Sequence, residues 1–348
     1  MAAVLGKALS LPFSPVISGA LLVLLTNGPD TLREPLQRLM ASDGATKKGI
    51  QVLKYLFGIG IALNVNNALS SWALANWQNP FRARKDKWTG HELAVVTGGS
   101  NGIGSFISKG LARSGHLVAI IDLVEPNAEL RAVANIHFFK CDITDPEQVK
   151  QTADAIISQL GKPSILCNNA GIGHAHTILE TTPQYLRKLF EVNLFSHFYL
   201  LQSFLPHMIE ARKGHIITTC SMSSYLSPVG LVDYAASKAA VMAFDEGLRQ
   251  EIKHRYGAPE IMTSCIHPTY VKTALVNSWE KELEKTKALV LTPEPVGNTI
   301  VKHILQRKGG RVFLPEWLGV GAGLRIFPLW LSDLVRDCRK SDMLPDLK

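Results

Sequence analysis

The sequence predicts a doubly wound α/β domain, in which helices cover both faces of a parallel β-sheet. Three observations lead to this prediction. Apolar, β-branched runs alternate with segments of helical periodicity from residue 90 onward. A glycine-rich turn at residues 97–104 follows the first apolar run directly and opens a helix-like pattern. Polar side chains follow several strand-like runs, and a parallel sheet binds its ligands at the carboxyl ends of its strands.

Size and composition agree with one large domain that carries appendages. The chain has 348 residues, 46% of them hydrophobic, which supports a sizeable core and argues against disorder. We expect an apolar and basic N-terminal region at 1–88, the α/β domain at 89–312 and an apolar C-terminal tail at 313–348.

Two uncharged stretches in the N-terminal region indicate contact with a membrane. In residues 8–29, the dense apolar part Val16–Leu25 is short for a span and is typical of a signal-type or interfacial segment. Residues 55–77 suit a bilayer span in length and carry aromatic side chains at both ends. Three central asparagines argue against a span, because amides in lipid need partners. A span, an interfacial segment and ordinary helices packed on the α/β domain therefore stay open.

The distribution of charge favours a membrane surface over nucleic acid. The net charge is +8, and residues 1–90 hold ten Lys/Arg against four Asp/Glu. These basic residues flank apolar segments without forming a groove interleaved with aromatic residues, so we expect no nucleic-acid partner. By the positive-inside rule, a basic cluster after the second stretch keeps the downstream domain on the cytosolic side. The cluster is Arg82, Arg84, Lys85 and Lys87.

The cysteines predict reduced thiols in a cytosolic environment and no metal site. They are odd in number, and no C-x-x-C pair occurs. For the loop histidines His174 and His176 we expect a place on the rim of a pocket or plain loop polarity, not metal binding. The five cysteines are Cys141, Cys167, Cys220, Cys265 and Cys338.

Six strand-like runs build the predicted domain in chain order. They are Leu93–Val96, Leu117–Ile121, Ile136–Phe139, Ile165–Cys167, His215–Thr219 and Met262–Ile266. Helical patterns lie between them, and Asp145-Pro146 and Thr182-Pro183 are helix starts, with a capping side chain before a first-turn proline. This alternation implies parallel strands joined by helices.

The turn after the first strand predicts a dinucleotide site. Its glycines permit a tight turn and a close approach of the backbone to a pyrophosphate, and the following helix supplies unpaired N–H groups. The second strand-like run ends in Asp122, about twenty residues further on, where an acidic residue typically holds a ribose 2′-hydroxyl.

An alanine-rich helical segment carries a candidate acid/base pair. Tyr234 and Lys238 lie four residues apart and so share one helix face. A lysine ammonium beside a phenol lowers its pKa from about 10, which makes the phenol a usable acid/base near neutral pH. Ser221 lies thirteen positions before Tyr234, and Asn193 lies further upstream.

Together these motifs resemble the short-chain dehydrogenase/reductase family over about residues 90–310. The resemblance implies a Rossmann-type doubly wound sheet in one catalytic domain. With its apolar ends, the whole chain resembles the membrane-associated branch that acts on retinoids, steroids or long-chain alcohols. The motifs, in family order and spacing, are Thr97…Gly98…Gly102…Gly104, Cys141-Asp142-Ile143, Asn168-Asn169-Ala170-Gly171, Asn193, Ser221 and Tyr234…Lys238.

The resemblance assigns a role to each matched residue. Tyr234 would be the general acid/base, and Ser221 would hydrogen-bond the substrate oxygen. Lys238 would hold the nicotinamide ribose and lower the pKa of the phenol, and Asn193 would position a relay water. The other implied cofactor contacts are Gly98, Ser100, Asn101, Gly102, Ile103 and Gly104 at the pyrophosphate, Asp142 and Ile143 near the adenine, Asn169, Ala170 and Gly171 beneath the cofactor, and Thr273 near the carboxamide.

We expect NAD as the cofactor, with NADP as the alternative. Asp122 would repel a 2′-phosphate, and Asn101 stands where NADP-preferring relatives often carry a basic residue. The expected reaction is hydride transfer to or from a lipophilic alcohol or carbonyl. The alternatives are an NADPH-dependent reductase of a secondary-metabolite ketone and a non-catalytic lipid-surface protein of the same fold.

The resemblance also bears on assembly, location and the variable loops. Family members often pair through the helices that carry Asn193 and Tyr234, which allows a homodimer. The expected location is a membrane of the endoplasmic reticulum or lipid-droplet type, with the catalytic domain facing the cytosol. Residues 273–291 fall where the family has its substrate lid. One departure is Pro268-Thr269, where family members usually have Pro-Gly.

Overall fold

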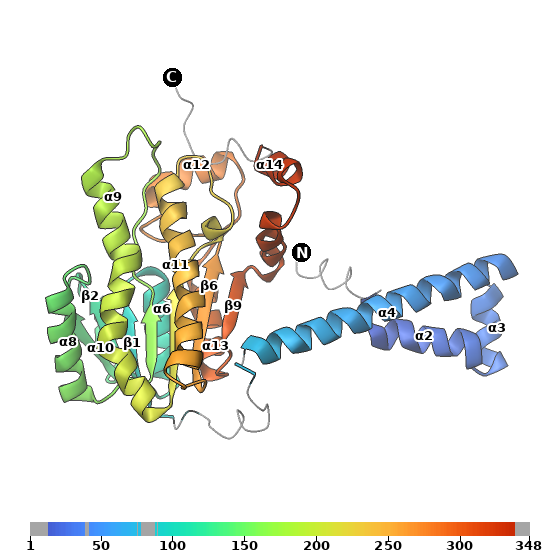
Figure 1. The fold of residues 1–348 in the computed structure, drawn as a ribbon, viewed down its shortest axis with the longest axis horizontal. Coiled ribbons are helices and arrows are strands. Elements are labelled where there is room, and N and C mark those ends of the chain that lie inside the picture. Colours follow the sequence, from blue (N-terminus) through green and yellow to red (C-terminus); the bar gives the residue numbers. More distant parts are fainter. Residues whose placement is uncertain (1–12, 39–41, 75, 78–87, 89, 338–348) are drawn as a thin grey trace. The chain divides into compact units, whose positions relative to one another are not determined.

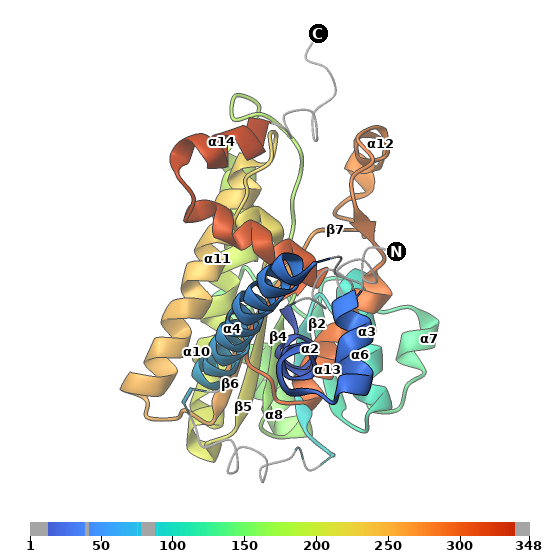
Figure 2. The ribbon, with the colours of Figure 1, turned by 90° about the vertical axis from the view of Figure 1, so that its right-hand side faces the viewer.

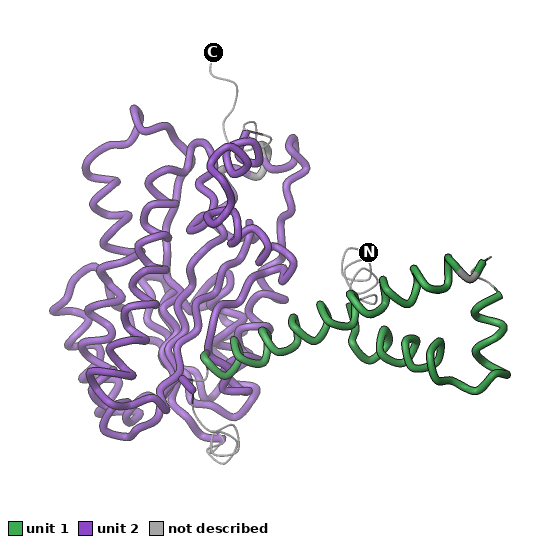
Figure 3. The backbone as a smooth tube through the Cα atoms, turned by 45° about the vertical axis from the view of Figure 1, so that its right-hand side comes forward, with its two compact units in different colours: residues 1–73 green, residues 74–348 purple. Residues whose placement is uncertain are grey.

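The computed structural model describes residues 13–38, 42–74, 76–77, 88 and 90–337. The chain divides into two compact units, residues 1–73 and residues 74–348 (Figure 3). The predicted basic cluster at residues 82–87 lies outside the described residues.

The N-terminal unit is helical. It contains α2 (Pro15–Asn27), α3 (Asp30–Arg38) and α4 (Asp43–Leu74), whose last residue lies beyond the unit boundary. Gly19 lets α2 approach α4, because a Cβ at that position would lie 2.8 Å from the ring of Phe57. The section Gly44–Leu74 of α4 is long and apolar enough to cross a membrane, and few of its side chains are buried. The helix therefore begins well before the uncharged stretch at 55–77 and includes three lysines in its first half.

The second unit is built on a seven-stranded parallel sheet with the order β3-β2-β1-β4-β5-β6-β9 (Figure 1). This confirms the doubly wound fold. The six predicted strands are present, and β9 completes the edge beside β6. The strands are β1 (Leu93–Thr97), β2 (Leu117–Asp122), β3 (Ile136–Lys140), β4 (Ile165–Asn168), β5 (Gly214–Thr219), β6 (Ile261–Pro268) and β9 (Gly310–Leu314).

Helices cover both faces of this sheet, as Figure 2 shows. One face packs against α6 (Gly102–Arg113) and α13 (Pro293–Leu305), and α7 (Ala128–Arg131) adds Leu130 to the same core. The other face packs against α8 (Pro146–Leu160), α10 (Ser196–Ala211) and α11 (Val232–Gln250). Both expected helix starts occur, since Asp145 and Thr182 each accept hydrogen bonds from the first turn of their helix.

Shorter elements gather above the carboxyl ends of the strands. The helix α9 (Pro183–Phe190) continues into a π-helical turn, η2 (Glu191–Phe195), and then into α10. After β6 come the strand pair β7 (Tyr270–Val271) and β8 (Val290–Leu291), with η5 (Asn277–Trp279) and α12 (Glu280–Lys285) between them. The C-terminal part forms η6 (Glu316–Arg325) and α14 (Leu329–Asp337).

Candidate active site

The glycine turn between β1 and α6 forms a narrow anion cradle. Gly98 and Gly102 have φ angles of +63° and +54°, which residues other than glycine rarely adopt. A Cβ at Gly104 would lie 2.0 Å from the carbonyl oxygen of Gly98. The side chain of Asn101, at the N-cap of α6, makes no capping hydrogen bond. The first N–H groups of α6 therefore have no acceptor within their helix and can bind a phosphate.

Asp122 is fixed at the edge of this cradle. Its Oδ2 accepts a hydrogen bond from the backbone N–H of Ser100 at 3.1 Å, and its Oδ1 accepts one from the N–H of Val124 at 3.2 Å. Each carboxylate oxygen keeps a further lone pair for a hydroxyl ligand. The carboxylate thus links the end of β2 to the glycine turn and can still accept hydrogen bonds from a ribose.

The segment after β4 is tied to the end of β1. The backbone N–H groups of Asn169 and Ala170 donate to Oγ1 of Thr97 at 3.0 and 3.1 Å. A Cβ at Gly171 would lie 3.5 Å from Nζ of Lys238. Even a methyl group at Gly171 would therefore contact the lysine, so this segment passes close to Lys238.

A cavity of about 1030 Å³ opens over the carboxyl ends of the strands. Apolar residues of the C-terminal part, including Trp317, Leu324 and Phe327, form part of its wall. Thr269 also lines it, and its N–H donates to the carbonyl oxygen of Leu314 at 2.9 Å, which sets the path of the loop that departs from Pro-Gly. The predicted site residues that line this cavity are Gly98, Asn101, Gly102, Ile103, Asp122, Asn169, Ala170, Gly171, Ser221, Tyr234, Lys238 and Thr273.

Five predicted residues lie outside the lining of this cavity. Ser100 and Gly104 belong to the cradle itself. Asp142, after β3, accepts hydrogen bonds from the N–H and hydroxyl of Thr144, and Ile143 beside it is buried. The fifth residue, Asn193, is buried in the π-helical turn η2.

Tyr234, Lys238 and Ser221 meet within the cavity. The ammonium of Lys238 donates to the carbonyl oxygen of Thr219 at 2.9 Å and lies 5.7 Å from the centre of the Tyr234 ring. The Ser221 hydroxyl acts on the phenol of Tyr234 and lowers its pKa. This arrangement joins a proton donor, a hydroxyl that can stabilise a developing oxyanion and a cation.

The pKa of the phenol corrects one expectation. Burial raises the pKa of Tyr234 above its usual value, while the hydrogen bond with Ser221 lowers it. Burial also lowers the pKa of Lys238. The prediction that Lys238 holds the phenol's pKa below its ordinary value is thus wrong for this structure, because the cost of desolvating a phenolate outweighs the attraction of a lysine 5.7 Å from the ring centre.

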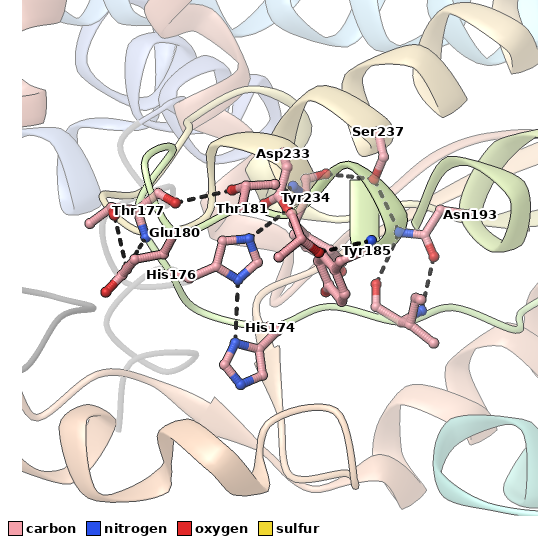
Figure 4. Close-up of polar contacts among 12 residues, drawn as sticks. His174, His176, Thr177, Glu180, Thr181, Tyr185, Asn193, Asp233, Tyr234 and Ser237 are labelled. Carbon is pink, nitrogen blue, oxygen red and sulfur yellow. Dashed lines mark hydrogen bonds and ion pairs between the residues drawn. The ribbon is translucent and has the colours of Figure 1, made fainter. Parts of the chain in front are cut away.

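Asn193 acts as a clamp between the loop after β4 and α11, as Figure 4 shows. It is fully buried in the π-helical turn η2. Its Oδ1 accepts from the N–H of Ile172 at 2.9 Å, and its Nδ2 donates to the carbonyl oxygen of Ile172 and to Oγ of Ser237, both at 3.0 Å. The side chain therefore fixes the loop and the helix that carries Tyr234 relative to each other.

The two loop histidines belong to a second clamp on the same helix (Figure 4). Nε2 of His176 lies 2.9 Å from Oδ2 of Asp233, and Oδ1 of Asp233 lies 2.7 Å from the N–H of Tyr234. The ring of Tyr185 packs edge-on against His176 at 5.0 Å, and His174 contacts His176 from the solvent side. Sequence reasoning missed Asp233 as the partner, although its position directly before Tyr234 was a usable signal.

A third cluster, Cys220, Cys265 and His267, lies beneath the site. The ligand-type atoms that these buried side chains offer lie within 4.8 Å of one another. Burial raises the pKa of the nearby Asp245 carboxyl to about 7. Sequence reasoning missed the cluster because its members are far apart in the chain and meet through the pairing of β5 with β6.

Comparison with known proteins gives a consistent result. The family model described as short chain dehydrogenase matches residues 92–284. Dehydrogenase RED2 of Cochliobolus heterostrophus is 41% identical over 212 residues, which cover 61% of this chain and 80% of that protein. Epidermal retinol dehydrogenase 2 of Mus musculus is 30% identical over 256 residues, which cover 71% of this chain and 81% of that protein.

A solved structure shows the same fold. It is a short chain dehydrogenase/reductase from Burkholderia phymatum in complex with NAD, with a TM-score of 0.61 and 22% identity. The match covers 74% of this chain and 98% of that one.

Proposed function

This chain belongs to the short-chain dehydrogenase family and is an oxidoreductase, and from that premise we propose that it transfers a hydride between NAD and a lipophilic alcohol or carbonyl compound. The observation that carries the proposal is the meeting of Ser221, Tyr234 and Lys238 in a cavity that also reaches the glycine cradle. A bound nicotinamide cofactor supplies or accepts the hydride.

The residues divide the remaining chemistry among them. Tyr234 gives a proton to the carbonyl oxygen during reduction and removes it from the hydroxyl during oxidation. Ser221 donates a hydrogen bond to the same oxygen and stabilises the charge that develops there. Lys238 holds the ribose of the cofactor, and its charge favours the phenolate when the phenol loses its proton. Asn193 holds the loop after β4 and the helix α11 in fixed positions relative to each other, and it positions a relay water.

The cradle and Asp122 support NAD over NADP. Asp122 already accepts two backbone hydrogen bonds, so its carboxylate is held in place where it would repel a 2′-phosphate. The glycines at 98, 102 and 104 line the pyrophosphate in this proposal. Asp142 and Ile143 border the adenine, and Thr273 borders the carboxamide.

The apolar wall and the apolar helix α4 support a lipophilic substrate drawn from a membrane. The section Gly44–Leu74 is suited to a membrane by length and composition. Exposed apolar side chains of the C-terminal part, such as Val320, Ile326 and Trp330, suit an interfacial patch. The mouse relative at 30% identity is a retinol dehydrogenase by name. The protein would then work on membranes of the endoplasmic reticulum or lipid-droplet type, with its catalytic domain in the cytosol, as a monomer or homodimer.

A panel of retinoid, steroid and long-chain alcohols, with the matching carbonyls, tests this proposal through the absorbance of NADH. Tyr234→Phe should lower turnover of any active substrate by about 10²-fold or more, because the proton donor is lost. The control is Tyr256→Phe, which changes an exposed tyrosine and should leave turnover unchanged. Equal turnover by both variants would rule out the catalytic assignment of Tyr234.

A further inference from the structure

The register of β5 and β6 places three metal-binding side chains on one face of the sheet. Thr218 pairs with Cys265, so the position of Cys220, two residues on, stands opposite His267. Side chains two residues apart in a strand point to the same face. The N–H of Cys220 donates to the carbonyl oxygen of Ile266 at 2.8 Å, which continues the ladder to this point. All three side chains are buried, with exposed fractions of 2% or less.

Two buried polar atoms, one in this trio and one on α11, have no hydrogen-bond partner among the residues that the structure describes. Nδ1 of His267 lies 3.1 Å from Oγ of Ser224 and 3.2 Å from the carbonyl oxygen of Ser221, whereas its Nε2 is unpaired. Oδ1 of Asp245 is also unpaired, although the side chain is only 8% exposed. Leaving such groups buried and unpaired is unfavourable, because they give up their hydrogen bonds with water.

Asp245 lies on the element that covers the trio. It is one turn from Val241 of α11, and Val241 packs against both Cys220 and Cys265. Asp245 therefore faces the trio from the covering helix and is not one of its three members. A cation among these groups would satisfy a thiol pair, an imidazole and a carboxylate together.

We propose that Cys220, Cys265 and His267 bind one zinc-type divalent cation, and that the Asp245 carboxylate, which lies outside this group of three, moves in as the fourth ligand. Two thiolates, one imidazole and one carboxylate form a four-coordinate set that suits Zn²⁺. A zinc-binding histidine usually donates its other N–H to a carbonyl or carboxylate, and Nδ1 of His267 already faces the carbonyl oxygen of Ser221. The proposal departs from the expectation of no metal, which rested on the odd number of cysteines and the absence of a C-x-x-C pair.

Such an ion would stabilise the positions of the residues that line the active-site cavity. Cys220 directly precedes Ser221, and its Sγ lies 3.1 Å from the carbonyl oxygen of Lys238. The ion would tie the end of β5, the end of β6 and α11 together beneath the cavity. Its role is structural, because every ligand is buried.

The metal content of the full-length protein tests the site directly. The protein is purified under reducing conditions without a polyhistidine tag or a chelator, and its zinc is measured by mass spectrometry. We expect about one zinc per chain. Cobalt added to the metal-free protein should give a thiolate-to-cobalt charge-transfer band. Zinc-free protein that also gives no such band would overturn the proposal, as would a Cys220–Cys265 disulfide in the native protein.

Matched variants locate the metal. Cys265→Ala should lose both the zinc and the cobalt band, whereas Cys167→Ala should keep them, because Cys167 is an equally buried thiol in the core of the opposite face. If Cys265→Ala fails to fold, Asp245→Asn serves instead and should weaken cobalt binding by about tenfold or more. Equal metal content in all variants would contradict the site. None of these measurements needs turnover, so the proposed function can fail while the metal site stands.

Discussion

At the scale of single residues, the proposed preference for NAD over NADP depends on Asp122. Its carboxylate is oriented by the N–H groups of Ser100 and Val124 and borders the cavity. Asp122→Ala removes a negative charge from the place where a 2′-phosphate would bind. We expect the ratio of kcat/KM for NAD to that for NADP to fall by about tenfold or more, which corresponds to about 1.4 kcal/mol.

The control for this measurement is Asp154→Ala. Asp154 is an exposed carboxylate on α8 and does not line the cavity. This variant should leave the cofactor ratio nearly unchanged. An unchanged ratio in Asp122→Ala would show that another group makes the discrimination.

His176 is a positioning residue for Tyr234. It holds Asp233 at 2.9 Å, and Asp233 in turn contacts the N–H of Tyr234. A hydrogen bond to a charged group contributes about 1.5–3 kcal/mol, so His176→Ala should lower kcat/KM by about tenfold or more if the loop and the tyrosine both shift.

Rescue separates positioning from a merely structural effect. His176→Gln keeps a hydrogen-bond donor for Asp233 and should recover most of kcat. His174→Ala should act like the unmodified enzyme, because His174 contacts the rings of His176 and Tyr185 from the exposed side and makes no contact with Asp233. If His176→Gln is as impaired as His176→Ala in kcat, the hydrogen bond to Asp233 does not position the tyrosine.

Residue-scale prediction from sequence succeeds where chemistry depends on local spacing. Tyr234 and Lys238 share a helix face, and the glycines of the turn lie within one short segment, residues 98–104. It fails where partners meet through strand register. His267 and Cys220 are 47 positions apart, and nothing in either local sequence announces the other. The pKa of Tyr234 also could not be predicted, because burial is a property of the folded site.

At the scale of elements, the turn between β1 and α6 has no room for a methyl group at Gly104. A Cβ at Gly104 would lie 2.0 Å from the carbonyl oxygen of Gly98, so the backbone itself would have to move. Gly104→Ala should therefore abolish NADH binding measured by fluorescence titration.

Gly247→Ala is the matched control for this element. Gly247 lies in α11 with open space around the position of a Cβ, so alanine there should leave NADH binding intact. Circular dichroism checks that Gly104→Ala remains folded. Normal NADH binding by a folded Gly104→Ala would mean that the cradle does not hold the cofactor.

Element boundaries follow sequence only where the signal is apolar. The six predicted strands are apolar runs, whereas β9 (Gly310–Leu314) contains Arg311 and begins with glycine, and so it gave a weaker signal. The helix α4 extends back to Asp43, well before the uncharged stretch begins at residue 55. Lysine is a good helix former, so the lysines that end the uncharged stretch do not end the helix. The edge strand β9 still matters for the site, since its end fixes Thr269 through the carbonyl oxygen of Leu314.

At the scale of the whole molecule, the layered fold buries histidines that must stay neutral. His197 of α10 packs against Phe244 of α11, and His215 of β5 lies 2.9 Å from Oγ of Ser264. Burial lowers the pKa of each to about 3. The two-faced sheet that assembles the active site therefore also makes stability depend on pH.

The direction of this pH dependence follows from the protons that the folded and the unfolded chain bind. Below the unfolded pKa of about 6.5, the unfolded chain binds a proton at each histidine, while the folded chain does not until about pH 3. The contribution of each histidine to the free energy of unfolding should thus be fully present above pH 6.5. It should fall by about 1.4 kcal/mol for each pH unit below that value.

His197→Phe removes one of these contributions, and a phenylalanine can pack against Phe244. Between pH 7 and pH 5 it should lose about 2 kcal/mol less than the unmodified protein in denaturant unfolding followed by tryptophan fluorescence. His254→Phe, which changes an exposed histidine on η4 (Glu251–Arg255), should leave the loss unchanged. An identical loss in His197→Phe and the unmodified protein would show that the acid sensitivity arises elsewhere.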